Sequence, residues 1–578
     1  MNDLQKNKRI PDGIFLIFFV CVTALFVGKA PYGFHFFDEA NWLTLSRRLL
    51  QGDALFAEDW SITQTGLSLL YPLMLLYDRI FDGTEGMVLT FRYAFVVFHA
   101  VNTLLLYLLL RRKSAWKALC AVTVFMPFTR WSAENFSYYQ LSLEYVLLCG
   151  ALLATMKKPY AALPTAGFLF SLAVLTCPFL AVYYVLYTLV CVVFAILRKE
   201  KPAAFRGRVW LLFSGGCAAA AVLFLSFVFS RCSLRELLIN LPYIFGDKSH
   251  DVGSAGSKLL RFFQGTVQYS NKADIPAIAA AAVLLADRKR RKRRSLYTAL
   301  LMLSCLFGLF GRYKSAFMSG MLTRDVCLMR PLCIAGFASY ILCDKKDKEF
   351  FVWIYLGACA HFVCLYLASD LGYDIYNTAM TGAAAASACF MAQLLSELQQ
   401  ENGGRKAPGY AAAALCLTML ASQLWVELEY RKNFCFCEPC GTALMSSVIR
   451  QGVGKGEKTA PEVAFYEQEG LWNATEKVRN APGDYVLYFS ADAWPYLEDS
   501  KRCASCSIWL QPRYAVEEAE RLLCYWELHP ERKPDAIFVS KTMEDAEEAM
   551  ELINTENFPV EENDRGYVLL RVKNGSEG

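Results

Sequence analysis

Two adjacent acids, Asp38 and Glu39, are the side chains in this sequence that are best placed to do chemistry. They lie in the segment Phe36-Phe37-Asp38-Glu39-Ala40-Asn41-Trp42, shortly after the first long apolar run ends. A basic stretch from Lys6 to Arg9 precedes that run, and positive charge favours the cytoplasmic side of a span, so the acids are predicted to lie outside the cytoplasm. A carboxylate there can accept a proton from an attacking hydroxyl group. It can also simply begin a helix, where its charge meets the positive end of the helix dipole.

Repeated apolar runs predict the kind of scaffold that positions these acids. The chain has 578 residues, of which 55% are hydrophobic. Many runs approach the roughly 20 residues that cross a bilayer, and clusters of Lys and Arg separate them at intervals that fit alternate crossings. The sequence therefore predicts an α-helical polytopic membrane protein with about 13 transmembrane helices. The expected spans lie near 13–30, 88–110, 115–129, 141–156, 160–176, 178–197, 209–230, 274–287, 295–311, 325–343, 350–369, 378–396 and 409–428.

The charge clusters also predict the side of the membrane on which each end of the chain lies. With the amino terminus in the cytoplasm, an odd number of spans places the carboxyl terminus outside it, in a multi-pass protein of the cell membrane. The strongest cluster, Arg288 to Arg294, is interpreted as an anchor that faces anionic headgroups, so no nucleic acid is expected as a partner. The first span has no small-residue cleavage site after it and is expected to remain as a signal anchor.

Residues 31–87, between the first two expected spans, are predicted to form one large outer loop. Within it, the apolar run from Leu67 to Tyr77 is too short to cross the bilayer and is expected to lie along the membrane surface. Trp42 and Leu45 begin the apolar face of another helical pattern. The loop is therefore expected to hold amphipathic helices at the headgroup level, with Trp42, Trp60, Tyr71 and Tyr77 as interfacial anchors.

Residues 430–578 are predicted to form a soluble extracytoplasmic α/β domain after a membrane domain that covers 1–429. The runs Asp484 to Ser490 and Asp535 to Ser540 are short and rich in β-forming residues, and a helical pattern follows each of them. Most of the 21 cysteines lie in apolar spans, where Cys behaves as a small hydrophobic residue. The others favour disulfides or free thiols over a zinc site in this compartment; they are Cys435, Cys437, Cys440, Cys503, Cys506 and Cys524.

An ordered set of elements runs through residues 36–113: Asp38-Glu39, Gly52-Asp53, the run from Leu67 to Phe81, and Arg92. This set resembles the amino-terminal region of the polyprenyl-phosphate-dependent glycosyltransferases of the GT-C fold, and most of all the protein mannosyltransferase and aminoarabinose transferase type. In that family an Asp-Glu pair, a Gly-Asp step, a second surface helix and an Arg follow one another in the same order. The resemblance implies a GT-C-like membrane domain and a sugar donor that is linked to a polyprenyl phosphate.

The resemblance also implies roles for three acids. Asp38, the first acid of the pair, corresponds to the general base that takes the proton from the acceptor hydroxyl as it attacks the anomeric carbon. Glu39 is expected to orient Asp38, to bind a cation or to cap the helix. Glu134, in the outer loop after the third span, matches an acid that contacts the sugar in family members, with Gln140 as an alternative for that place. Glu134 can equally pair with Arg130 at the headgroup level.

Departure of a prenyl phosphate requires cations that stabilise its charge. Basic residues in outer loops break the cytoplasmic bias and are the candidates, against the alternative that they reach for lipid headgroups. The candidate donor-phosphate-binding residues are Arg261, Arg312 and Arg324, with Lys258 and Tyr313 beside them. Where aminoarabinose transferases carry a phosphate-binding Lys, this chain has Gln64, so the sugar of that subfamily is not assigned to it.

These features predict a membrane glycosyltransferase that moves a sugar from a polyprenyl-phosphate carrier to an extracytoplasmic protein, lipid or cell-wall glycan acceptor. No cofactor is predicted, and assistance by a divalent cation is left open. The alternative is a transporter or flippase, although transporters usually place ionisable residues at mid-membrane and repeat their halves. Here ionisable residues inside spans are few, with Glu144 the main one, and His99 is expected to be packed and hydrogen-bonded. A scaffold without catalysis is a third hypothesis.

Overall fold

The computed structural model of the chain describes residues 9–34, 37–130, 133–156, 159–197, 205–245, 255–268, 274–316, 321–368, 372–401, 441–463 and 469–571. The side chains at 37–38, 159, 255, 306–328 and 374 are outside this description. The predicted span at 409–428 lies outside the described residues, as do Cys435, Cys437 and Cys440.

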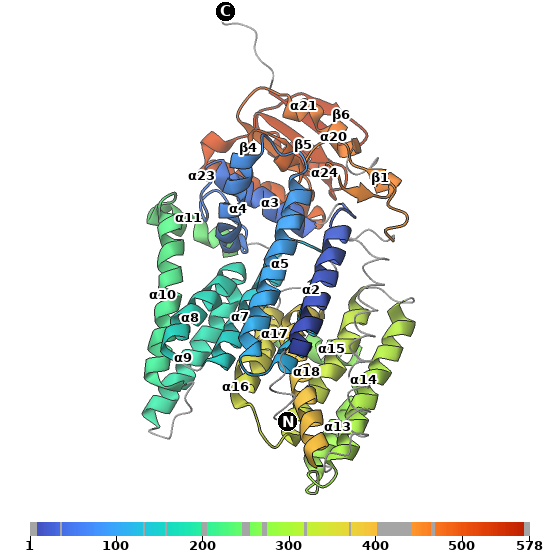
Figure 1. Cartoon of the computed structure of the whole chain (residues 1–578). Coiled ribbons are helices and arrows are strands. Elements are labelled where there is room, and N and C mark those ends of the chain that lie inside the picture. Colours follow the sequence, from blue (N-terminus) through green and yellow to red (C-terminus); the bar gives the residue numbers. More distant parts are fainter. Residues whose placement is uncertain are drawn as a thin grey trace, which may run out of the picture.

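Helices form a bundle, and a small sheet with its own helices lies over one end of that bundle (Figure 1). Two helices of the predicted outer loop, α3 (Phe37–Leu50) and α4 (Leu67–Ile80), pack between the bundle and the sheet. In the bundle, α8 packs against α7 and α10, and α18 packs against α6 and α15. The bounds of the other long helices are α2 Arg9–Lys29, α5 Met87–Arg111, α6 Ala115–Phe125, α7 Tyr138–Thr155, α8 Pro159–Thr176, α9 Ala181–Ile196, α10 Gly207–Phe229, α11 Leu234–Phe245, α12 Ala255–Gln268, α13 Asp274–Ala286, α14 Arg294–Ala316, α15 Met321–Leu342, α17 Gly357–Ala368 and α18 Tyr376–Glu401.

Six of the described helices are long and apolar enough to cross a membrane, judged by length and composition. They are Arg9–Lys29, Met87–Arg111, Pro178–Ile196, Gly207–Phe229, Lys348–Leu367 and Tyr376–Glu401. These helices support the predicted helical membrane protein. The number of thirteen spans and the sides on which the two ends lie stay predictions, because several of the other expected spans form shorter helices, such as the 11 residues of α6.

The part of the chain after residue 440 contains a mixed five-stranded sheet with the strand order β4-β3-β5-β7-β6. β3 (Tyr485–Phe489) and β5 (Ala536–Ser540) are parallel neighbours, and α23 (Ala515–Leu528) lies in the crossover between them. Every residue of β5 is buried, as expected for a strand that is covered on both faces. β7 (Gly566–Leu570) and β6 (Val560–Glu562) add antiparallel pairs on one side, and β4 (Arg502–Cys503) pairs parallel to β3 on the other.

The two faces of this sheet belong to different apolar cores, because side chains alternate along a strand. Val486 and Tyr488 share one core with Trp42 of α3. Leu487 belongs to a second core, which also contains Trp60 of the outer loop. The outer loop therefore packs into both cores, and the sheet is joined closely to the segment that carries Asp38 and Glu39.

A buried ion cluster also joins the outer loop to the region of the sheet. Asp53 accepts a hydrogen bond from Arg48 Nε at 2.7 Å and one from Arg532 Nη1 at 2.6 Å. Arg48 donates in addition to the Ser505 carbonyl at 3.0 Å. Because Asp53 is only 2% exposed, these two guanidinium groups, and not water, stabilise its negative charge.

Helix α3 of the outer loop is buried inside the protein, which corrects the expectation that it lies on the membrane surface. Helix α4 is only partly buried and keeps Leu76 and Ile80 exposed, so its place along the membrane surface stays a prediction. Trp42 and Trp60, two of the predicted interfacial anchors, are 2% and 0% exposed. Trp60 Nε1 donates to Asn240 Oδ1 at 2.9 Å, and its ring stacks on Tyr243 with centroids 4.7 Å apart. Amphipathic periodicity identifies the apolar face of a helix but not what covers that face, and here protein covers it.

The cysteines of the sheet region are free thiols within the described residues. Cys503 and Cys506 are buried and Cys524 is partly buried, and none of the three is in a disulfide. Burial raises the pKa of the Cys506 thiol to about 12, so it stays protonated and unreactive at neutral pH. Among the described residues, no group of three or more His, Cys, Asp or Glu side chains is arranged to hold a metal ion.

Candidate active site

Asp38 lies in the first turn of α3, and its side chain lies outside the described residues. The side chains that surround this turn are described. They form a buried polar cluster, named here the α3 cluster, which consists of Lys29, Glu39, Arg92, Glu134 and Glu457. These residues come from α2, α3, α5, the loop before α7, and the segment before the sheet, so the turn at Asp38 is held from several parts of the chain.

Glu39 is bound through both carboxylate oxygens by Arg92 of α5. Arg92 Nε donates to Oε1 at 2.8 Å, and Nη2 donates to Oε2 at 2.7 Å. Arg92 Nη1 donates to the carbonyls of Ala30 and Gly33 at 2.9 and 2.8 Å, which ties the end of α2 to the same guanidinium. Burial raises the pKa of Glu39 above its ordinary value, and Arg92 opposes that shift. This paired geometry fixes the position of the Glu39 carboxylate.

Glu457 brings a second carboxylate to Arg92 from the carboxyl-terminal part of the sequence. Its Oε1 lies 3.4 Å from Arg92 Nη1, and the side chain is 0% exposed. The backbone next to it is also anchored, because Gly33 donates its N–H to the Lys458 carbonyl at 2.8 Å. The sequence contains no motif around Glu457, so this contribution of the carboxyl-terminal region was missed and only the tertiary structure reveals it.

Glu134 belongs to the α3 cluster. It is 0% exposed, and its Oε2 lies 3.8 Å from Nζ of Lys29, in the last turn of α2. Gln140, the alternative for the sugar-contacting place, instead donates to Glu144 Oε1 at 3.1 Å and accepts from the backbone N–H of Arg130 at 3.3 Å. Of the two alternatives, the structure therefore brings Glu134 close to α3. Lys29 was not predicted as a site residue. Its position at the end of an apolar span could have identified it, because a charged residue there usually has a function.

A small cavity adjoins the α3 cluster. It is partly open and surrounds about 230 Å³ of space, its open side included. Glu39, Trp42 and Asn135 line it together with apolar residues of α3, α4, α5 and the loop before α7. The ring of Trp42 stacks on Tyr138 with centroids 5.9 Å apart. A carboxylate, an amide and an indole around one space are the kinds of groups that hold a polar ligand with an apolar face.

The candidate phosphate-binding residues lie on α12, α14 and α15. Lys258 of α12 is buried and donates to the carbonyls of Tyr366 and Leu367 in α17, at 3.4 Å for Tyr366. Arg261, one turn further along α12, is exposed. The side chains of Arg312 and Tyr313 on α14, and of Arg324 on α15, lie outside the described residues.

A further cation, Arg330, lies in α15 and was not predicted. Its Nη1 lies 3.2 Å from Oδ2 of Asp274, and its guanidinium lies 5.6 Å from the ring centroids of both Tyr373 and Tyr376. The residue is 8% exposed. A charge inside an apolar span was the signal that could have identified it, because such residues are costly and usually have a function.

His99 of α5 and Glu144 of α7 form a buried pair inside the bundle. His99 Nδ1 lies 2.5 Å from Glu144 Oε1, and His99 Nε2 lies 2.9 Å from the Met126 carbonyl. Both side chains are 0% exposed. The prediction that His99 is packed and hydrogen-bonded is confirmed.

The loop before the sheet is held against α5 by Glu498, at the end of α22 (Pro495–Glu498). Glu498 Oε1 accepts a hydrogen bond from the Val453 N–H at 2.7 Å, and the Val453 carbonyl accepts one from Val88 at the start of α5 at 3.2 Å. Gly452 has φ of +74°, and a Cβ there would lie 2.2 Å from Glu498 Oε1. Only glycine therefore permits this close approach.

We expect the stability of the protein to fall as the pH rises from about 4.5 to about 7, through Glu498. Burial raises the pKa of this carboxyl to about 7, from an ordinary value of 4.5. In that pH window the folded state binds more protons than the unfolded state, so the stabilisation is complete below the ordinary pKa and is lost as the pH passes the raised one. The effect is about 2 kcal/mol, allowing for partial exposure of the side chain.

The measurement is the unfolding temperature in detergent between pH 4.5 and 8, for wild type and Glu498→Gln. The amide resembles the protonated carboxyl, so the variant is expected to lose this part of the pH dependence. Glu551→Gln on the exposed face of α24 (Ala546–Ile553) is the control and should follow wild type. Parallel curves for wild type and Glu498→Gln would contradict the assignment.

No protein-family model matches this chain, and a comparison with curated proteins finds no similar one. The resemblance to glycosyltransferases therefore rests on the sequence of the first outer loop alone.

Proposed function

We propose that this protein is a membrane glycosyltransferase that transfers a sugar from a polyprenyl-phosphate carrier to an extracytoplasmic acceptor. Asp38 acts as the general base, Glu39 positions the turn that carries Asp38, and Glu134 contacts the sugar. The acceptor is a hydroxyl group of a protein, a lipid or a cell-wall glycan.

One observation carries the proposal: the bidentate pair between Arg92 and Glu39 is buried at the turn that contains Asp38. Its two contacts of 2.7 and 2.8 Å hold the residue next to Asp38, and a second buried carboxylate, Glu134, lies in the same cluster. A catalytic base must be held within a fraction of an ångström of its working position. A solvated acid at an ordinary helix start needs no such support.

The reaction needs one proton transfer and one leaving group. The acceptor oxygen forms a bond to the anomeric carbon while the bond between that carbon and the phosphate oxygen breaks. The proton of the acceptor hydroxyl passes to Asp38, and the prenyl phosphate leaves with the bonding electron pair. Cations in the outer loops and helices stabilise the charge of the departing phosphate. The predicted set is Arg261, Arg312 and Arg324, with Lys258 and Tyr313 beside them.

The experiment supplies purified protein in detergent with a panel of prenyl-phosphate sugars and measures the release of prenyl phosphate. At least one donor is expected to be cleaved, and cleavage should increase when an acceptor with free hydroxyl groups is added. If every carrier stays intact in detergent while sealed vesicles that contain the protein move the same compounds, the proposal is wrong.

A transporter is the second candidate function, and the buried pair between His99 and Glu144 is the observation that favours it. Ionisable side chains that are 0% exposed within a helical bundle are typical of proton and substrate pathways in membranes. The vesicle experiment separates the two functions, because a transporter moves its substrate without breaking a bond. Loss of that flux in His99→Gln would support transport.

A further inference from the structure

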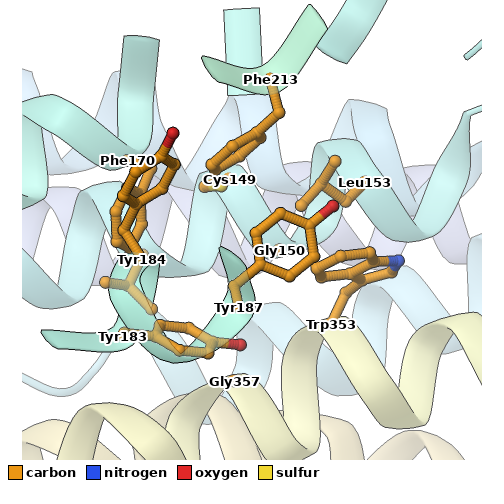
Figure 2. A pocket seen from close by; sticks show the side chains of 11 residues that line it. Cys149, Gly150, Leu153, Phe170, Tyr183, Tyr184, Tyr187, Phe213, Trp353 and Gly357 are labelled. Carbon is orange, nitrogen blue, oxygen red and sulfur yellow. The ribbon is translucent and has the colours of Figure 1, made fainter. Parts of the chain in front are cut away.

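A second cavity lies inside the bundle and is almost entirely apolar. It is partly open and surrounds about 490 Å³ of space, its open side included, among α7, α8, α9, α10 and the π-helical turn Phe351–Leu356 that precedes α17. Figure 2 shows aromatic side chains around this space, among them Phe170, Tyr187, Phe213 and Trp353. Tyr187 meets Phe213 edge to face with ring centroids 5.8 Å apart, and meets Trp353 in the same way at 6.3 Å.

This cavity is separate from the α3 cluster. Gly150, which lines the cavity, lies roughly 18 Å along α7 from Tyr138, at a rise of 1.5 Å per residue. Tyr138 is the first residue of α7, and it marks the end of that helix that follows Glu134 in the sequence. The cavity therefore belongs to the half of the bundle away from the sheet, and no residue that lines it belongs to the proposed catalytic site.

Two glycines on facing walls keep the cavity open. A Cβ on Gly150 would lie 2.6 Å from the Trp353 carbonyl oxygen, so this glycine lets the π-helical turn approach α7. A Cβ on Gly357 would meet no atom within 4 Å, so this glycine leaves space that a side chain could fill. Single π-helical turns are rare and occur frequently at functional sites. The opening is thus a product of two local backbone features and not only of loose packing.

The surroundings indicate what fills this space. α9 forms one wall, and its other face keeps Val185, Leu186 and Leu189 exposed, as expected for a helix that faces lipid. The hydroxyl of Tyr184 is already hydrogen-bonded to Ser214 Oγ at 2.7 Å. Water gains little in an apolar cavity, and an empty one loses packing contacts along its whole lining. The hydrocarbon chains on the other side of α9 are the nearest material that fits.

We propose that this cavity binds one acyl chain of a bilayer phospholipid, which enters beside α9 and packs against Tyr187 and Trp353. The headgroup stays at the membrane surface and the chain occupies the space next to Gly357. Such binding does not require the transferase reaction, so it can be tested without a sugar donor.

The test uses a phosphatidylglycerol with a photoreactive diazirine in the middle of one acyl chain, added to delipidated protein in detergent. After illumination, peptide mass spectrometry is expected to find the label on the cavity side of α9, at Tyr183, Tyr184 and Tyr187, and on Trp353. Gly357→Leu fills the space and is expected to lower this labelling by about tenfold, the effect of excluding about two methylene groups. Gly215→Leu is the control, because Gly215 in α10 also has no atom within 4 Å of a Cβ but does not line the cavity.

Labelling confined to the exposed face of α9 in wild type would overturn the proposal, and this result does not depend on whether any variant folds. Equal labelling of the cavity residues in Gly357→Leu and wild type would also overturn it. A parallel experiment uses a polyprenyl phosphate with the same photoreactive group. If this compound labels Tyr187 and Trp353 while the phospholipid does not, the occupant is a carrier lipid and the assignment to phospholipid is wrong.

Discussion

Replacing Asp38 with asparagine is expected to lower the rate of glycosyl transfer by about 10²–10⁴-fold, the range over which a general base contributes to catalysis. Asparagine keeps the size of the side chain, but its amide cannot take the proton of the acceptor hydroxyl. The measurement is the initial rate of sugar transfer from a cleavable prenyl-phosphate donor, with both proteins in the same detergent.

Asp82→Asn is the matched control, because Asp82 is an exposed acid in the same outer loop. It is expected to transfer sugar at the wild-type rate. Both variants should unfold close to the wild-type temperature, since loss of a charge near a helix start changes stability by about 0.3–1 kcal/mol. A wild-type rate in Asp38→Asn would remove Asp38 from the role of base and make Glu134 the next acid to test.

Replacing Arg92 with leucine is expected to lower the free energy of unfolding by about 3–5 kcal/mol, the usual cost of removing one partner from a buried ion pair. Glu39 and Glu457 would keep buried carboxylates without the guanidinium that now faces both of them. The carbonyls of Ala30 and Gly33 would also lose their donor. The measurement is the apparent free energy of unfolding from SDS titration in mixed micelles.

Two further variants separate the causes of this loss. Arg79→Leu removes an exposed arginine from α4 and should change stability by less than about 0.5 kcal/mol. Arg92→Lys keeps the charge but loses the paired geometry, so an intermediate loss is expected. If Arg92→Leu costs no more than Arg79→Leu, the pair does not hold α3, and the main support for the proposed function is lost.

The role of Glu457 changes how the carboxyl-terminal region is interpreted. This region was predicted to be a soluble domain that follows the membrane domain. In the described structure it supplies a carboxylate to Arg92 and packs against α3. The candidate site is therefore built from both ends of the chain, and removal of the sheet region would expose the apolar face of α3.

Local patterns predicted the helical elements well. Apolar length and spaced basic clusters depend only on neighbouring residues, so helices α2, α5, α9 and α10 lie close to the expected ranges. The same reasoning placed helices at α3 and α4 in the outer loop. What covers α3 was predicted wrongly, because an amphipathic face is equally suited to a membrane surface and to another layer of protein.

The sequence alone determined that this protein is helical and rich in membrane-type segments, and that an acid pair follows its first apolar helix. Only the tertiary structure decided which charges meet, because such contacts join residues far apart in the chain. Asp53 and Arg532 are 479 positions apart and form a hydrogen bond of 2.6 Å, and Glu457 meets Arg92 in the same way across most of the chain. No local periodicity encodes these pairs. They form because burial removes water from each charge, and only the opposite charge that the fold brings alongside can replace it.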